Sequence, residues 1–170
     1  MASGTSGSLG RWRRQALRRM ASSREATLKL VARIPEREIM RPRTQDAWSV
    51  KDMLGHLMAC DEETLKRFQL IARGRADRIK WFESMAYADR FNARTVGQAR
   101  KLPLKTVLRR MARARAAMID TFEALPMGAL RDPSHAYPVV DWLTAPGWSH
   151  EWDHAREIRD WWRTRRRADS

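Results

Sequence analysis

The sequence has little cysteine and no long apolar run. Cys60 is the one cysteine among 170 residues, so the chain cannot form an internal disulfide and requires no oxidising compartment. Apolar residues nowhere continue for about 18 positions, the length that a membrane-spanning helix needs. The first ten residues are small and polar where a secretory signal would need an apolar stretch. We therefore expect a cytoplasmic protein that does not cross a membrane.

Two further absences limit the fold class. No segment alternates apolar and polar residues with the period of two that is typical of a half-buried strand, and no segment repeats another. A chain of 170 residues is long enough to bury a hydrophobic core as one domain. The sequence therefore predicts an all-α fold, with one domain over residues 11–167 and a disordered Gly/Ser/Thr-rich tail over residues 1–10.

Positive charge is in large excess. Lys and Arg number 34 against 20 Asp and Glu, which gives a formal net charge of +14. Such a balance raises the local concentration of anions, including nucleic acid, acidic lipid and phosphorylated metabolites. The arginines are spread over three segments, and no nucleic-acid-binding motif accompanies them. We therefore expect nucleic acid to bind only weakly and without sequence preference.

Apolar residues at helical spacing mark four long helices. They cover residues 11–34, 50–73, 103–125 and 144–167. The second is the best marked, because Ser49 is a suitable N-cap with Asp52 three residues later, and Gly74 follows its last turn. The connection over residues 75–102 is long enough to cross a four-helix bundle, so the second and third helices can run parallel. Residues 81–94 within it are expected to form a short extra helix.

Three of the four histidines fall on the second and fourth predicted helices. His150 and His154 are four residues apart, which is about 400° of helical rotation, so their side chains leave the same face one turn apart. His56 lies within about 60° of Met53 and Cys60 around its own helix. Three imidazoles that converge inside the bundle could hold Zn, Ni, Cu or Fe with an open position for water or substrate. The same spacing also occurs in surface and core histidines that bind no metal.

Two motifs resemble a known superfamily. The run WSVKDMLGHLMACDE (residues 48–62) resembles the second-helix signature of the DinB/YfiT-like metalloenzymes, and GWSHEWDHAREIRDWW (residues 147–162) resembles their last helix. Residues 91–126 are also similar to the branch that includes mycothiol-dependent maleylpyruvate isomerases and the ClbS/DfsB group. The resemblance covers about residues 11–165.

This resemblance implies an up-down-down-up bundle, often dimeric, with a divalent metal (Zn, Ni or Fe) held by His56, His150 and His154. For characterised members it implies thiol-dependent transfer or isomerisation, so a low-molecular-weight thiol is a second expected cofactor. The ClbS-like branch instead hydrolyses a cyclopropane-bearing genotoxin, so the fold alone does not choose the reaction. Cys60 departs from the family pattern, because relatives often have an aromatic residue there.

Several residues near the histidines are candidates for the pocket or for orienting a ligand imidazole. They are Cys60, Trp48, Trp148, Trp152, Glu151 and Asp153. Cys60 lies one turn from His56, which could act as its base, although a small core residue is the simpler interpretation. The tryptophans either fill the core or wall an apolar substrate pocket. The acidic residues of the last helix, Glu151, Asp153 and Glu157, either make its surface hydrophilic or supply one carboxylate that orients an imidazole. His135, in a turn-like segment, is not predicted to be a ligand.

Three hypotheses for function remain open. The first is a metal-dependent detoxification enzyme, a thiol- or water-dependent transferase, isomerase or hydrolase acting on a small electrophile or xenobiotic. The second is a ClbS-like self-resistance protein that hydrolyses or sequesters a genotoxic small molecule without metal. The third is a basic, DNA-damage-associated bundle that binds nucleic acid. Metal content separates the first two, and the salt dependence of nucleic-acid affinity isolates the third.

Overall fold

The computed structural model describes residues 3–43, 48–132 and 137–168. The prediction of an all-α fold is confirmed, because these residues form helices and turns and contain no β-strand. None of the described helices has a stretch long and apolar enough to cross a bilayer.

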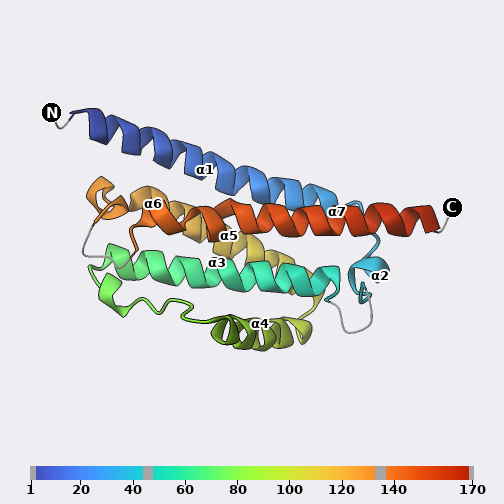
Figure 1. Cartoon of the computed structure of the whole chain (residues 1–170). Coiled ribbons are helices and arrows are strands. Elements are labelled where there is room, and N and C mark those ends of the chain that lie inside the picture. Colours follow the sequence, from blue (N-terminus) through green and yellow to red (C-terminus); the bar gives the residue numbers. More distant parts are fainter. Residues whose placement is uncertain (1–2, 44–47, 133–136, 169–170) are drawn as a thin grey trace.

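Four long helices make up most of this structure (Figure 1). They are α1 (Ser3–Val31), α3 (Val50–Ala72), α5 (Leu104–Ala124) and α7 (His150–Ala168). A shorter helix, α4 (Met85–Arg100), packs against α3 and overlaps the segment where the sequence predicted a short helix. The remaining elements are short: α2 (Glu36–Ile39), η1 (Ala76–Arg78), η2 (Met127–Leu130), α6 (Val139–Trp142) and the π-helical turn η3 (Ala145–Ser149).

The start of α1 corrects one prediction. The helix begins at Ser3, inside the segment predicted to be a disordered tail, so that prediction is wrong for residues 3–10. The physical reason is tertiary packing: Leu9 is buried in the same hydrophobic cluster as Met20 and Phe122. Burying an apolar side chain offsets the poor intrinsic helix propensity of Gly and Ser.

The ends of α3 follow local sequence signals. The Ser49 side chain accepts a hydrogen bond from the Asp52 N–H, and the Asp52 carboxylate accepts one from the Ser49 N–H, as the sequence predicted. At the other end Gly74 has a φ of 66°, a conformation that favours glycine and stops the helix. Within α3, a Cβ on Gly55 would collide with the Cβ of Ala99, so glycine allows α4 to approach closely.

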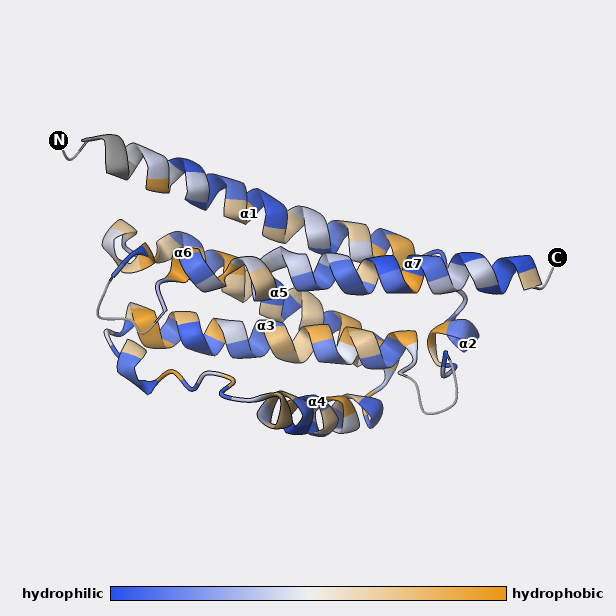
Figure 2. Ribbon diagram, viewed as in Figure 1, coloured by the Kyte–Doolittle hydropathy of each residue, from blue (hydrophilic) through white to orange (hydrophobic). Residues whose placement is uncertain are grey.

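Two hydrophobic clusters fill the interior. In one, Phe68 near the end of α3 stacks on Phe122 near the end of α5, with ring centroids 5.4 Å apart. The other contains Met53 and Val107, near the beginnings of the same two helices. Because the beginnings share one cluster and the ends share the other, α3 and α5 run in the same direction. Figure 2 shows that the C-terminal half of α7, in contrast, is mostly hydrophilic.

Candidate metal centre

Three imidazoles meet between α3 and α7. His56 projects from α3, while His150 and His154 project from the first two turns of α7. The Nε2 atom of His150 lies 3.2 Å from Nε2 of His56 and 3.0 Å from Nε2 of His154. One nitrogen from each ring lies within 4.8 Å of the other two. The structure therefore brings together the three histidines that the sequence singled out.

These nitrogens are spaced to share a metal ion. Two nitrogens on a tetrahedral zinc ion, each about 2.05 Å from it, lie about 3.3 Å apart, close to the 3.2 Å and 3.0 Å separations here. Binding through Nε2 places the ring proton on Nδ1. Nδ1 of His154 is buried without a hydrogen bond, and the nearest carboxylate oxygen, Oε2 of Glu157, lies 3.6 Å away. A small shift would let Glu157 accept that proton and orient the imidazole.

Burial keeps all three imidazoles neutral. Burial, with smaller contributions from the nearby His150 and His154, lowers the pKa of His56 from 6.5 to about 3. Burial also lowers the pKa of His150, with His154 adding to the effect. The pKa of His154 is lowered by burial as well, although Glu157 opposes the shift. At neutral pH the rings therefore carry lone pairs that can bind a cation.

A π-helical turn sets the position of His150. Pro146, in the first turn of η3, has no N–H to donate to the residue four positions earlier. The next N–H, that of Gly147, donates to the Leu143 carbonyl at 2.8 Å. A side chain on Gly147 would press on Leu143, at 3.2 Å from its Cδ1. The sequence predicted an ordinary α-helix here; turns of this kind often occur at functional sites.

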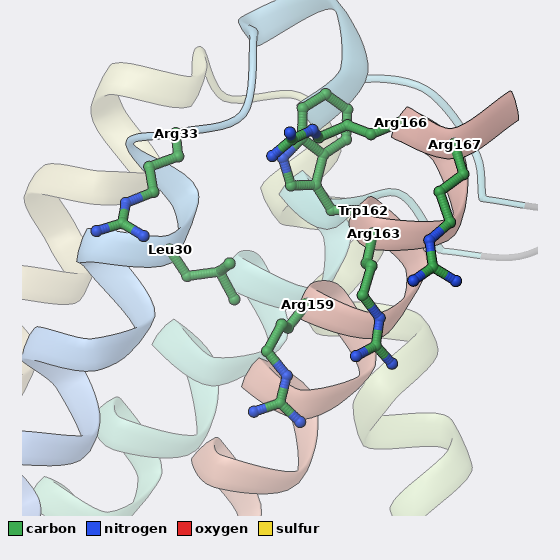
Figure 3. A pocket seen from close by; sticks show the side chains of 7 residues that line it. All are labelled: Leu30, Arg33, Arg159, Trp162, Arg163, Arg166 and Arg167. Carbon is green, nitrogen blue, oxygen red and sulfur yellow. The ribbon is translucent and has the colours of Figure 1, made fainter. Parts of the chain in front are cut away.

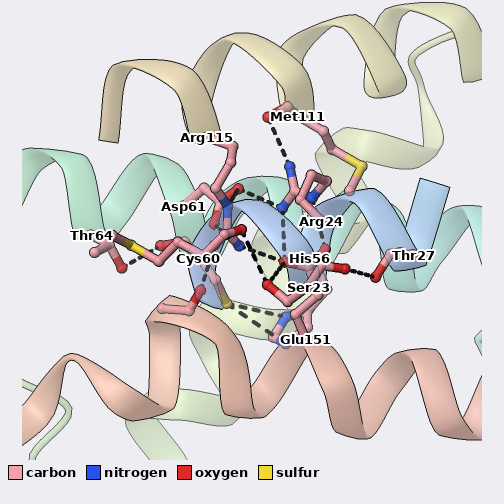
Figure 4. A network of polar contacts seen from close by, with 12 residues as sticks. Ser23, Arg24, Thr27, His56, Cys60, Asp61, Thr64, Met111, Arg115 and Glu151 are labelled. Atoms are coloured by element: carbon pink, nitrogen blue, oxygen red, sulfur yellow. Dashed lines mark hydrogen bonds and ion pairs between the residues drawn. The ribbon is translucent and has the colours of Figure 1, made fainter. Parts of the chain in front are cut away.

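A buried network of four charged side chains, one from each long helix, lies near His56 (Figure 4). Its members are Arg24, Asp61, Arg115 and Glu151, whose side chains are at most 6% exposed. Arg24 lies 2.6 Å from an Asp61 oxygen and 2.7 Å from a Glu151 oxygen. Arg115 lies 2.8 Å from Asp61 and 2.6 Å from Glu151, and also donates to the Gly147 carbonyl. The two positive and two negative charges balance.

This network borders the site along the chain. Asp61 directly follows Cys60, and Glu151 directly follows His150. The network therefore fixes the backbone of α3 and α7 beside the imidazoles. Sequence reasoning missed its two arginines and Asp61. Their partners are far away in the sequence, so the ion pairs can be recognised only once the helices are packed together.

Two of the predicted pocket residues lie beside His56. The Sγ atom of Cys60 is 3.7 Å from the His56 Nε2 atom and borders a cavity. Burial, with a smaller contribution from the charge of Asp61, raises the pKa of the Cys60 thiol to about 12, so the thiol is protonated at neutral pH. The ring of Trp48 has its centroid 5.1 Å from that of His56. Cys60 therefore contacts the site as a neutral thiol.

The other predicted pocket residues lie elsewhere. Trp148 is 3% exposed and packs in a hydrophobic cluster, and Trp152 is 38% exposed on the surface. Glu151 belongs to the buried network and does not orient an imidazole. Asp153 is largely exposed and pairs with Arg156. His135 lies outside the described residues.

A cavity of about 540 Å³ opens beside His56 and His150. Its wall is largely aromatic, with a few polar side chains. The residues besides the two histidines and Cys60 include Arg67, Trp81, Phe82, Asn92, Tyr137 and Trp142. Most belong to segments outside the four long helices, so helical periodicity could not place them at the site. Arg67 is the exception, because it follows His56 by three helical turns on α3.

The comparisons with known proteins agree with this geometry. A search of curated proteins and a search of solved structures each found no match. The sequence model of one family, the DinB superfamily, matches residues 19–158, a range that contains the three histidines and the whole buried network. Because this match covers most of the chain and includes the candidate metal centre, the protein belongs to the DinB superfamily.

Proposed function

We propose that this protein is a metal-dependent enzyme that transfers, isomerises or hydrolyses a small electrophile or xenobiotic, with a thiol or water as nucleophile. The observation that carries the proposal is the convergence of three neutral imidazoles at the edge of an aromatic cavity. The cavity is of a size that suits a small organic molecule. His56 and His150 border it, so a group bound by the histidines would face the substrate.

His56, His150 and His154 would hold the ion, with Zn, Ni or Fe as the candidates. A bound divalent ion polarises a substrate oxygen and favours the deprotonated form of a water or thiol nucleophile. Cys60 is a poor candidate for that nucleophile, because burial keeps its thiol protonated. The neighbouring imidazole that could accept the proton is that of His56, which would instead hold the ion. The nucleophile would therefore enter from outside, as water or as a low-molecular-weight thiol.

We also infer that the four long helices form an up-down-down-up four-helix bundle. Met20 of α1 and Trp148 of η3 share one hydrophobic cluster, while Val31 of α1 and Ile158 of α7 share the other. This pairing favours parallel α1 and α7, opposite in direction to α3 and α5. The bundle would place the histidines and the charged network midway along its axis.

Metal analysis coupled to turnover tests the proposed enzyme. Untagged protein, purified without chelators, is analysed for bound metal and assayed with epoxides, cyclopropanes and maleyl compounds, with and without low-molecular-weight thiols. We expect turnover that requires metal, is lost after chelation and returns when metal is restored. Turnover that survives complete metal removal and the His150→Ala substitution would instead favour the metal-free, ClbS-like hypothesis.

A basic cleft favours a second, weaker activity (Figure 3). It has a volume of about 660 Å³, and its walls contain Leu30, Trp162 and five arginines: Arg33, Arg159, Arg163, Arg166 and Arg167. Arginine and tryptophan together suit the phosphates and bases of single-stranded nucleic acid. We propose weak binding without sequence preference. Its affinity should fall steeply between about 0.05 and 0.2 M salt; sequence-selective binding that persists at the higher concentration would contradict it.

A further inference from the structure

Arg67 places a buried positive charge at the wall of the aromatic cavity. It follows His56 by 11 residues on α3, which is about 1100° of rotation and brings both side chains to within about 20° of the same direction. Along the helix axis the two residues are about 16 Å apart. Both border the same cavity. The guanidinium and the candidate metal centre therefore lie at two places along the wall of one cavity.

The charge of Arg67 is poorly compensated. The side chain is 10% exposed, and its Nε and Nη2 atoms are buried without a hydrogen bond. The nearest carboxylate in an ion pair with it is that of Glu63, whose oxygen lies 3.7 Å from Nε, too far for a hydrogen bond. Burial lowers the pKa of the guanidinium, and Glu63 only partly opposes this.

Aromatic rings surround this guanidinium. Its central carbon lies 4.9 Å from the ring centroid of Trp81, 5.2 Å from that of Phe82 and 5.9 Å from that of Trp142. Ring faces attract a cation, but they accept its N–H groups only weakly. The indole N–H of Trp142 is likewise buried without a hydrogen-bond partner. The region around Arg67 thus contains several N–H donors that have no acceptor among the described residues.

Donors without acceptors point to a ligand that brings oxygen acceptors. A guanidinium matches a carboxylate best, because its parallel N–H groups can donate to both oxygens. The aromatic wall between Arg67 and the histidines favours an apolar body. We propose that Arg67, assisted by Trp142, binds a substrate carboxylate, so that the substrate is a small carboxylic acid whose apolar body reaches toward the histidines. That the bound acid is a substrate rests on the proposed function; that Arg67 binds its carboxylate does not.

Paired ligands that differ only in charge test the proposal. The probes are 4-phenylbutyrate and 4-phenylbutyramide, titrated into the full-length protein and followed by tryptophan fluorescence and calorimetry. We expect the acid to bind about tenfold more tightly than the amide, and Arg67→Gln to remove this preference while leaving amide affinity nearly unchanged. Arg73→Gln, at an exposed arginine directly after the end of the same helix, removes equal charge and should keep the preference.

A second experiment distinguishes a carboxylate bound by Arg67 from one bound by the metal. A carboxylate held by a metal would lose its preference after chelation and in His150→Ala, whereas one held by Arg67 keeps it. Preference in chelated protein together with absence of turnover would defeat the proposed enzyme and leave the carboxylate site intact. Equal affinities of the wild-type protein for acid and amide, or a preference that survives Arg67→Gln, would overturn the inference. Should Arg67→Gln fail to fold, Arg67→Lys, which lacks the paired N–H groups, is expected to weaken the preference severalfold.

Discussion

His150 is the central imidazole of the candidate metal centre, because its Nε2 atom lies within 3.2 Å of both other Nε2 atoms. We expect His150→Ala to reduce bound metal from about one ion per chain to near zero while the helix content stays unchanged. Elemental analysis and circular dichroism measure the two effects. Asp153→Ala, three residues further along the same helix, changes an exposed side chain and should keep the metal. Full metal occupancy in His150→Ala would show that these three histidines do not hold the metal.

The buried neutral histidines also predict how the metal-free protein responds to acid. In the unfolded chain each imidazole takes up a proton near pH 6.5, whereas burial holds the pKa of His56 at about 3 in the folded state. The unfolded state therefore binds more protons below pH 6.5, and the free energy of unfolding falls as the pH decreases. Each histidine that stays neutral contributes a slope of about 1.4 kcal/mol per pH unit.

Urea unfolding of chelated protein between about pH 7 and pH 4.5 measures this slope. His56→Gln should make it shallower, since glutamine does not titrate. A free energy of unfolding that stays constant over that range in the wild-type protein would contradict the prediction.

At the scale of elements, the contact between α3 and α4 depends on one missing side chain. The Cβ in Gly55→Ala would meet Ala99 of α4, and we expect the clash to destabilise the protein by about 1–3 kcal/mol despite the better helix propensity of alanine. Gly97→Ala is the matched control, because a Cβ there has no neighbour within 4 Å. That control should stabilise by about 0.5–1 kcal/mol. Chemical denaturation of both variants checks the opposite signs, and equal effects would show that the helices are not in close contact.

How well each element could be predicted depends on where its determinants lie. Both ends of α3 follow nearby residues, Ser49 with Asp52 and then Gly74, and the sequence located them closely. The start of α1 depends on burial of Leu9 against distant residues, so local composition was misleading. The π-helical turn before His150 required knowledge of how Gly147 packs on Leu143. The histidines were found because their spacing along helices is itself the signal.

At the scale of the whole molecule, the buried network should dominate stability among the ion pairs. Asp61→Ala leaves Arg24 and Arg115 close together, buried and without one of their two carboxylates. We expect this to cost about 3–5 kcal/mol. Arg156→Ala, which breaks the exposed pair with Asp153, should have little effect. Denaturant unfolding of both variants makes the comparison, and equal destabilisation would mean that the network is not the principal ionic contact between helices.

The sequence could not predict which arginines are buried in the network and at the cavity wall. The chain has 34 Lys and Arg, and most of the described arginines are at least partly exposed. Arg24, Arg67 and Arg115 are the buried ones among the described arginines. Nothing in their immediate sequence neighbours distinguishes them, because the burial of each depends on packing against distant segments of the chain.

The buried network also restricts how the helices can be aligned. Since each long helix supplies one charge, sliding any one of them by a turn, about 5.4 Å, would leave an unpaired ion in an apolar interior. Misaligned packings are thereby penalised, and His56 meets His150 and His154 only in the alignment that also pairs the four charges. We expect a variant with all four charges replaced by apolar residues to remain helical but to populate several packings, visible as broadened NMR signals. The buried network thus selects the one helix alignment in which the three histidines meet.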